Sequence, residues 1–289
     1  MNYKKPKVIA EIGCNHKGDF SIAIELLKLA KECGANVAKF QKRNNKELLT
    51  EEQYNAAHPN LANSYGDTYG AHREFLEFSV EQHKDLKEYC DSIDLEYSTS
   101  VWDVTSAKEM ITFNPGLLKV PSACNNHFEM LKVLRDEFKG EVHLSFGMTT
   151  QDEEKKIVEF FEETNQAKNR LVIYSCTSGY PVPFDNVCLL EIERLRREYK
   201  DRVKDIGFSG HHLGIAIDNA AYALGATWVE RHFTKDRTWK GTDHAASLEP
   251  TGLRKLCRDL NATYESLTYK DAEILDIEKV QRDKLKYRK

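Results

Sequence analysis

Two histidines follow short apolar runs in the C-terminal half of the chain. His211 comes after the run at 205–208, and His232 comes after the run at 226–229. A helical pattern separates these runs, so we predict two parallel strands whose carboxyl ends lie side by side. Imidazole is the commonest metal ligand in proteins, and the pair therefore predicts a metal site. Either histidine alone could instead be a hydrogen-bonded core residue.

Two lysines lie within other runs that we predict to be strands. Lys39 lies in 37–41 and Lys119 lies in 117–120. A lysine inside a parallel barrel must find an anionic partner or shift its pKa, so each implies a bound anion or a carboxylate such as Glu11. With hydroxyl residues at other strand ends, the two ammonium groups suit a phosphate or carboxylate ligand. Any single serine or threonine there could simply meet solvent.

Short β-rich runs alternate with helix-length segments along the chain. The first helix is expected to begin after Asp19, a plausible N-cap, and to stop at Gly34. Eight strands are predicted, at 8–11, 37–41, 95–98, 117–120, 142–145, 171–175, 205–208 and 227–229. Eight strand–helix units in about 260 residues favour a single (β/α)8 TIM barrel over a doubly wound sheet. The polar residues that end the strands would then converge on one face.

Composition limits the class of protein. The 289 residues are 40% hydrophobic with a net charge of −4, and no basic run could follow a nucleic-acid backbone. The start of the chain lacks an apolar signal segment, and no run of about 18 apolar residues occurs. Seven scattered cysteines form no Cys-x-x-Cys pair. We expect a cytoplasmic protein without nucleic-acid or membrane partners.

The strand-end motifs resemble those of the sialic acid synthase family over nearly the whole chain. The matching segments are AEIGCNH at 10–16, AKFQ at 38–41, KVPS at 119–122, LSFGM at 144–148, CT at 176–177 with YP at 180–181, SGH at 209–211, and RHFT at 231–234 running on to Pro250. The resemblance implies a TIM barrel that condenses phosphoenolpyruvate and water with an N-acetylated hexosamine aldehyde, such as N-acetylmannosamine. The products would be a sialic-acid-like 3-deoxy-2-keto nonulosonic acid and phosphate.

The resemblance also implies roles for individual residues. His211 and His232 would hold a divalent ion, with manganese expected and magnesium or cobalt as substitutes, and this ion would polarise the sugar aldehyde. Glu11, Lys39 and Lys119 are implied as catalytic groups. The positions implied to bind substrate are Gln41, Thr99, Ser122, Ser145, Ser178, Tyr180, Ser209 and Asp243.

Three positions depart from the family pattern. Cys124 stands where an acidic residue that contacts the sugar is usual, Gly210 where an aspartate is common, and Ser178 where an asparagine is common. A thiol cannot reproduce a carboxylate, so the sugar is not fixed as N-acetylmannosamine. We expect Cys124 to be a packed thiol rather than a catalytic one, because no base lies beside it in the sequence.

We predict a synthase domain at 1–268 and a charged tail at 269–289. Many proteins of the family that the chain resembles carry a small C-terminal antifreeze-like domain, which lends an arginine to the partner subunit, and that domain is expected to be absent here. A homodimer is implied, and a separate antifreeze-like chain is a candidate partner. The long segment at 44–77 is expected to be a lid over the catalytic face, with Arg73 replacing that arginine. The tail is either a solvated helix or a contributor to the phosphate side.

Two alternatives remain open. The first is a phosphoenolpyruvate-condensing synthase for another aldose, including a phosphorylated one. The second is a non-catalytic or partner-dependent barrel. The retained lysines and histidines argue against the second, because buried charges without a function would be costly. Bound metal and thermal stabilisation by manganese would separate an enzyme from an inert barrel.

Overall fold

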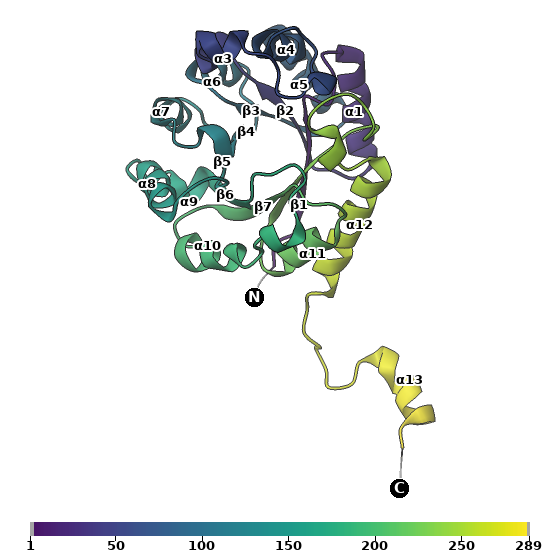
Figure 1. Cartoon of the computed structure of the whole chain (residues 1–289). Coiled ribbons are helices and arrows are strands. Elements are labelled where there is room, and N and C mark those ends of the chain that lie inside the picture. Colours follow the sequence, from purple (N-terminus) through teal and green to yellow (C-terminus); the bar gives the residue numbers. More distant parts are fainter. Residues whose placement is uncertain (1–2, 288–289) are drawn as a thin grey trace.

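The computed structural model describes residues 3–287 and confirms the predicted (β/α)8 barrel (Figure 1). Among these residues, eight parallel strands close into a barrel in sequence order. The strands are β1 (Lys7–Gly13), β2 (Val37–Lys42), β3 (Glu96–Val101), β4 (Leu117–Val120), β5 (Glu141–Ser145), β6 (Leu171–Cys176), β7 (Asp205–Gly210) and β8 (Trp228–His232). Several of them extend further than predicted, and β3 continues past its predicted end as far as Val101.

A ring of helices surrounds the strands (Figure 1). One helix follows each strand around the ring: α1 (Phe20–Glu32), α5 (Val80–Ser92), α6 (Val104–Ile111), α7 (Phe128–Asp136), α8 (Gln151–Glu162), α10 (Glu191–Tyr199), α11 (Ala216–Ala223) and α12 (Pro250–Ser266). Shorter helical segments lie between them: η2 (Ser122–Cys124), α9 (Ala167–Arg170), η3 (Phe184–Asn186) and η4 (His244–Ala246). None of the helices that the structure describes is long and apolar enough to cross a membrane.

Helix α1 shows how local sequence sets these boundaries. The side chain of Asp19 accepts hydrogen bonds from the backbone N–H groups of Ser21 and Ile22, which would otherwise lack partners at the helix start. The helix buries Leu26, Leu27 and Ala30 at helical spacing. Gly34 follows with a φ of +92°, a conformation that favours glycine. The predicted start and stop of this helix are confirmed.

The inside of the barrel is layered. A lower layer near the amino ends of the strands is largely apolar, with Ile9, Val37, Leu117, Val172 and Trp228, and the buried ring of His143 packs against Trp228. Two residues further along four of these strands come Glu11, Lys39, Lys119 and Glu230, all buried. Side chains two apart in a strand share a face, so these charged groups stack directly above the apolar layer. The interior of the barrel is therefore filled by side chains toward the amino ends of the strands and carries charged groups toward their carboxyl ends.

The segment at 44–77 is not a structureless loop. It contains α2 (Asn45–Leu48), α3 (Glu51–Asn55), η1 (Leu61–Asn63) and α4 (Tyr69–Leu76). It reaches the loop after β8, where the Tyr65 hydroxyl bonds the carbonyl of Lys240, and Gly241 N–H donates to Asn63 Oδ1 at 3.4 Å. Residues 44–77, which we call the lid, thus join two parts of the barrel rim.

The tail contains α13 (Asp276–Leu285), which buries no residue and lies away from the barrel (Figure 1). Its ion pairs are local, for example Lys270 with Glu278 at 2.9 Å. Of the two interpretations of the tail, the solvated helix agrees with this position.

A buried arginine ties β8 to the loop after β7. Arg231 points outward from β8 and is only 1% exposed. Its Nη1 donates to Asp218 Oδ2 at 2.5 Å and to the Gly214 carbonyl at 2.8 Å, and its Nη2 donates to the His212 carbonyl at 2.6 Å. These bonds hold in place the loop that begins with His211.

Asp218→Ala should therefore destabilise the fold. It leaves the Arg231 charge buried without its counter-ion, which costs roughly 3 to 5 kcal/mol of unfolding free energy. Urea denaturation measures the loss. Lys132→Ala is the control, because it breaks only an exposed ion pair with Asp136 and should cost less than about 1 kcal/mol. Equal losses in the two variants would contradict the anchoring role of Asp218.

Candidate functional site

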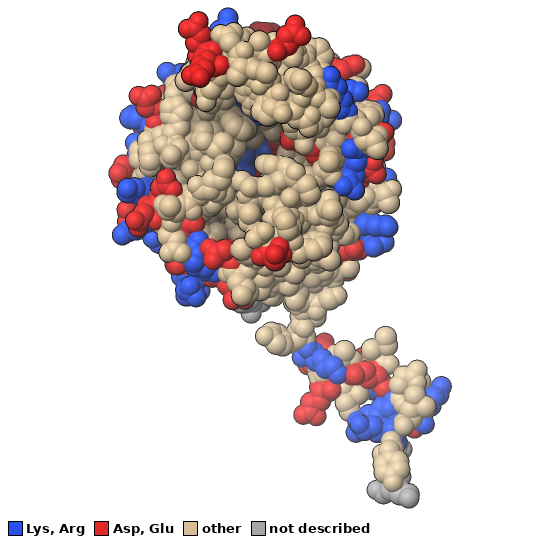
Figure 2. All heavy atoms as spheres, in the orientation of Figure 1, with Lys and Arg blue, Asp and Glu red and all other residues tan. Residues whose placement is uncertain are grey.

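A cavity of about 380 Å³ opens at the carboxyl ends of the strands, and residues that end or follow all eight strands line it. Figure 2 shows this face hollowed at its centre, with basic groups visible in the depth of the hollow. The lining residues are Glu11, Lys39, Gln41, Arg43, Arg73, Ser100, Trp102, Lys119, Pro121, Ser122, Ala123, Ser145, Met148, Cys176, Ser178, Tyr180, Ser209, His211, Glu230, His232, Thr242 and Asp243.

Every predicted site residue except Thr99 lines this cavity. Strand β3 continues to Val101, so Thr99 lies within the strand and pairs with Phe40, whose side chain belongs to the core outside the barrel. Side chains alternate along a strand, and Ser100 therefore takes the inward position. The prediction that Thr99 belongs to the site is therefore not met. It arose because the strand was predicted to end at residue 98, whereas β3 continues to Val101.

The floor of the cavity is a buried network of two ammonium groups and two carboxylates. Glu230 lies between the lysines, with Oε1 3.1 Å from Lys119 Nζ and Oε2 3.7 Å from Lys39 Nζ. Lys39 also forms an ion pair with Glu11 and donates to Ser100 Oγ at 2.8 Å. The expected pairing of Lys39 with Glu11 is present, whereas Glu230 was missed as a counter-ion.

Burial and charge act in opposite directions on this network. Burial lowers the pKa of Lys119 from its ordinary value of 10.5, and the charge of Glu230 partly opposes that shift. Burial alone would raise the pKa of Glu230, but the charges of Lys119 and Lys39 hold it well below the ordinary value. Ser209 Oγ further stabilises the Glu230 carboxylate with a hydrogen bond of 3.1 Å.

His211 and His232 lie together on the wall of the cavity, with ring centroids 5.5 Å apart. His211 Nδ1 donates to the Thr177 carbonyl at 3.1 Å, because a carbonyl can only accept, and this leaves Nε2 unprotonated. Burial, and then the nearby His232, lower the pKa of His211 to about 3. His232 Nδ1 is buried without a hydrogen-bond partner among the described residues. At neutral pH, His211 therefore has an imidazole nitrogen available as a ligand.

The donor set fits a metal ion that keeps open positions. The described part of the chain holds no group of three or more His, Cys, Asp or Glu side chains arranged for a metal. A metal ion held by the histidine pair would have two imidazole ligands, and water or substrate would complete its coordination shell. Open positions of this kind are typical of catalytic rather than structural metal sites.

A small residue allows hydroxyl groups to gather near Lys119. Gly147 N–H donates to Ser122 Oγ at 3.0 Å. A Cβ at position 147 would lie 2.4 Å from Ser178 Oγ and 2.6 Å from Ser122 Oγ. Glycine at this position therefore leaves room for the two hydroxyls, and together with Ser145 they form a group of hydroxyls suited to an anion.

Cys124 does not face the cavity. Its thiol is buried against the carbonyls of Val101 and Pro121, at 3.8 Å from each, and burial raises its pKa to about 12. Such a thiol is not a nucleophile at neutral pH. The expectation of a packed cysteine is consistent with this position, and Ala123 lines the cavity beside it.

Sequence reasoning missed several lining residues besides Glu230. Arg43 could have been found, because it continues the inward alternation of Lys39 and Gln41. Ser100 required the correct end of β3. Trp102, Met148 and Thr242 lie in loops after the strands, where no periodic pattern marks the inward side chains.

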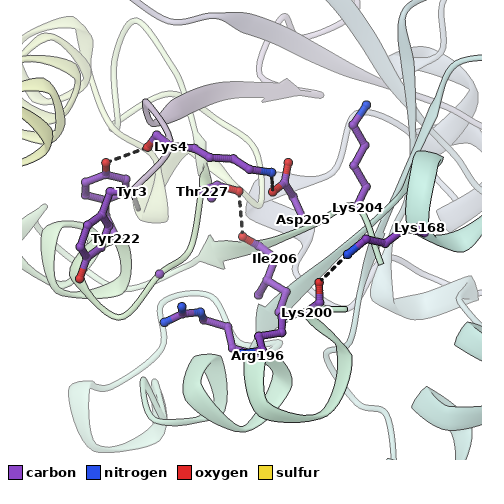
Figure 3. A pocket seen from close by; sticks show the side chains of 11 residues that line it. Tyr3, Lys4, Lys168, Arg196, Lys200, Lys204, Asp205, Ile206, Tyr222 and Thr227 are labelled. Atoms are coloured by element: carbon purple, nitrogen blue, oxygen red, sulfur yellow. Dashed lines mark hydrogen bonds and ion pairs between the residues drawn. The ribbon is translucent and has the colours of Figure 1, made fainter. Parts of the chain in front are cut away.

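A second cavity, of about 310 Å³, lies at the opposite end of the barrel and is rich in cations (Figure 3). Lys4 forms an ion pair with Asp205 at 2.5 Å. Lys168 Nζ donates to the Lys200 carbonyl at 3.1 Å, and Arg196 Nη1 to the Leu224 carbonyl at 2.8 Å, where α10 and α11 end. Cations that cap helix carboxyl ends explain this composition, so it is not the candidate site.

Comparison with known proteins finds relatives over most of the chain. The profile of the NeuB family matches residues 26–272. N-acetylneuraminate-9-phosphate synthase from Homo sapiens is 36% identical over 283 residues, covering 96% of this chain and 76% of the human protein. N,N'-diacetyllegionaminic acid synthase from Campylobacter jejuni is 29% identical, covering 91% of this chain and 78% of that protein. The crystal structure of N-acetylneuraminic acid synthetase from Leptospira borgpetersenii, in complex with citrate, has a TM-score of 0.81 and 26% identity, covering 99% of this chain and 94% of that one.

Glu230→Gln tests the charge network. We expect the pKa of Lys119 to fall further below its ordinary value, because burial then acts without the opposing carboxylate. NMR titration of ¹³C-labelled lysine side chains measures this, with Lys119 assigned from Lys119→Arg. Glu163→Gln, which removes an exposed carboxylate paired with Arg135, is the control. An unchanged titration of Lys119 in Glu230→Gln would show that Glu230 is not its counter-ion.

Proposed function

The chain belongs to the NeuB family and is an enzyme of the sialic acid synthase type, and we propose that it condenses phosphoenolpyruvate with an amino-sugar aldehyde and water. The products are a sialic-acid-like 3-deoxy-2-keto nonulosonic acid and phosphate. One observation carries this proposal: a single cavity holds a buried lysine–carboxylate network on its floor and a pair of imidazoles on its wall.

The floor of the cavity suits phosphoenolpyruvate. This substrate carries a phosphate and a carboxylate, and Lys119 with the hydroxyls of Ser122, Ser145 and Ser178 offers charge and hydrogen-bond donors to both. The backbone N–H of Gly147 donates to Ser122 Oγ and so fixes the position of that hydroxyl. The carboxylates that neutralise the lysines in the free protein leave the network near neutral, so an anion can enter without strong repulsion.

The wall of the cavity suits the sugar aldehyde. A divalent ion held by His211 and His232, with manganese expected, would draw electrons from the aldehyde oxygen and make its carbon electrophilic. Tyr180 packs against His211 with ring centroids 4.4 Å apart and limits where the sugar can lie. Gln41 and Asp243 offer an amide and a carboxylate to the sugar hydroxyl and acetamido groups.

The reaction then needs two charges to be stabilised. Carbon 3 of phosphoenolpyruvate forms a bond with the aldehyde carbon, whose oxygen takes the electron pair, and carbon 2 becomes electron-poor. The carboxylates of Glu11 and Glu230 stabilise the positive charge that develops on carbon 2. Water bonds to carbon 2, the bond between carbon 2 and the phosphate oxygen breaks, and the two water protons pass to the former aldehyde oxygen and to phosphate.

Phosphate release from phosphoenolpyruvate tests this activity. We expect release with manganese and one sugar from a panel of N-acetylmannosamine, mannose, their 6-phosphates and diamino analogues. His211→Ala and His232→Ala should each lower turnover by more than about 100-fold, because even loss of outer-shell ligand partners costs 10–100-fold. His127→Ala, a half-buried histidine outside the cavity, is the control. Absence of both phosphate release and manganese-dependent thermal stabilisation would favour an inert barrel.

A phosphorylated aldose is the second candidate substrate. The human relative is named a 9-phosphate synthase. Condensation adds three carbons ahead of the aldehyde carbon, so a 9-phosphate product requires a hexosamine 6-phosphate. Arg73 lines the cavity, and its guanidinium donates hydrogen bonds to the neutral Tyr69 hydroxyl, at 3.1 Å and 2.6 Å, rather than to a carboxylate. Asp243 lies within reach of its charge, so an anionic group on the sugar would share the guanidinium with that carboxylate.

Arg73→Ala separates the two sugars. If Arg73 binds the sugar phosphate, the KM for a 6-phosphorylated aldose should rise by about 10- to 100-fold, the size of a lost charge-assisted hydrogen bond, with little change for the unphosphorylated sugar. Steady-state kinetics with matched sugar pairs measure this. Equal losses for both sugars would make Arg73 a general lid residue. Unchanged turnover and sugar affinity for both would show that Arg73 has no role in sugar binding.

A further inference from the structure

A buried ion pair joins the two ends of the lid. Arg43 directly precedes the lid, and Glu77 is its last residue. Arg43 N–H donates to Glu77 Oε2 at 3.0 Å, and Arg43 Nη1 donates to Glu77 Oε1 at 3.2 Å. The two side chains are only 3% and 9% exposed. A pair across 34 residues of sequence, made through both backbone and side chain, closes the lid at its base.

Both terminal nitrogens of the Arg43 guanidinium contact groups at or near the cavity, whereas Nε is buried without a hydrogen-bond partner among the described residues. The guanidinium stacks on Trp102, with 4.3 Å between the guanidinium carbon and the ring centroid. Nη1 also contacts Cys14 Sγ at 3.5 Å, and Nη2 donates to Gln41 Oε1. A lysine could not make this combination, because it lacks both the planar fork and the flat face.

The contact with Gln41 fixes which way its amide points. Gln41 Oε1 accepts from Arg43, so Gln41 Nε2 must face the other side, where it donates to Glu11 Oε1 at 2.8 Å. The second Nε2 proton remains for a ligand in the cavity that Gln41 lines. Glu11 can only accept and so favours the same orientation from the other side, but without Arg43 the weak donor of the Cys14 thiol is the group among the described residues that would contact Oε1.

The contact with Glu77 fixes the end of α4. Glu77 caps this helix and follows Arg73 by four residues, which is about one helical turn. At the other end of the lid, Asn44 N–H donates to Asp103 Oδ2 at 2.7 Å, and Glu47 accepts from Val104 N–H at 3.0 Å. Arg43 is therefore connected both to Gln41, which lines the cavity, and to the helix that brings Arg73 to the cavity.

Stability alone gives a weak reason for such a pair. Burying two charges costs desolvation free energy that their attraction often fails to recover, and an apolar pair of similar volume is often as stable. The pair does, however, set a geometry that apolar side chains could not set, because it orients an amide and a helix end at once.

We propose that Arg43 and Glu77 form a clamp that positions Gln41 and the Arg73-bearing helix for the sugar substrate. Arg43 is a positioning residue in this clamp and acts on the sugar through Gln41 and α4. The kinetic consequence rests on the proposed synthase activity, whereas the consequence for lid motion does not.

Hydrogen exchange tests the clamp without any substrate. Glu77→Gln keeps the shape of the side chain but removes its charge, and Arg43→Met removes the fork. Both should raise backbone exchange in the lid by roughly 10-fold or more, as expected for loss of a charge-assisted hydrogen bond. Glu154→Gln is the matched control, since it breaks a similarly buried pair with Arg194 on the outer helices, at 2.8 Å, and should leave lid exchange unchanged. Unchanged lid exchange in Arg43→Met and Glu77→Gln would overturn the clamp.

Steady-state kinetics test whether Arg43 acts on the sugar substrate through Gln41. Arg43→Met should lower kcat/KM for the sugar by about 10- to 100-fold while the KM for phosphoenolpyruvate changes less than about threefold, because the hydrogen bonds that this change removes lie on the sugar side. In a Gln41→Ala background, the same Arg43→Met change should lower kcat/KM by a clearly smaller factor than in the parent, since one of the two routes through which Arg43 acts is already gone. Arg43→Lys should not restore the parent value. Fully multiplicative losses, or rescue by lysine, would overturn the positioning role.

The hydrogen-exchange and kinetic experiments together distinguish failure of the clamp from failure of the proposed function. If the parent enzyme releases no phosphate with any sugar, the proposed function fails, and hydrogen exchange alone decides whether the clamp exists. If the parent is active and lid exchange is unchanged in both clamp variants, the clamp is wrong while the synthase assignment stands.

Discussion

Two ammonium groups inside a parallel barrel are the constraint on which the site depends. Lys39 and Lys119 cannot stay charged there without counter-ions, and the fold supplies Glu11 and Glu230 at the same level of the barrel. The apolar layer beneath excludes water, which strengthens each of these interactions. The other residues of the cavity surround this floor. Its two positive and two negative charges balance before an anion binds, and the lysines can then interact with the anion.

The cavity separates its two kinds of chemistry by strand. Donors for an anion come largely from the strands around Lys119, whereas the imidazoles come from the ends of β7 and β8. In the proposed reaction, a cation held by the imidazoles would stabilise the aldehyde oxygen as it becomes electron-rich, and Glu11 and Glu230 on the floor would stabilise the carbon that becomes electron-poor. Arg231, buried outside the barrel, anchors the loop that begins with His211 and so maintains the separation.

The sugar side is where this chain differs most from the pattern that it otherwise follows. Cys124 is packed in the core, so no carboxylate stands at that point of the wall. Asp243, Arg43 and the lid arginine Arg73 are charged groups on this side. The lid is a set of short helices whose two ends are joined by the ion pair between Arg43 and Glu77. Under the proposed function, contacts between the lid and the sugar would therefore depend on this pair.

Local sequence signals were enough to predict the barrel and to name most of the polar residues that line its cavity. The N-cap at Asp19, the alternation of strands and helices, and the strand-end motifs each depend only on residues close in the chain. The folded structure was needed to show that Glu230 is a counter-ion, that Ser100 rather than Thr99 faces inward, and that Arg43 meets the far end of the lid. Those facts depend on strand register and on contacts between distant segments, which a linear pattern does not encode because it records spacing along the chain and not the direction of each side chain.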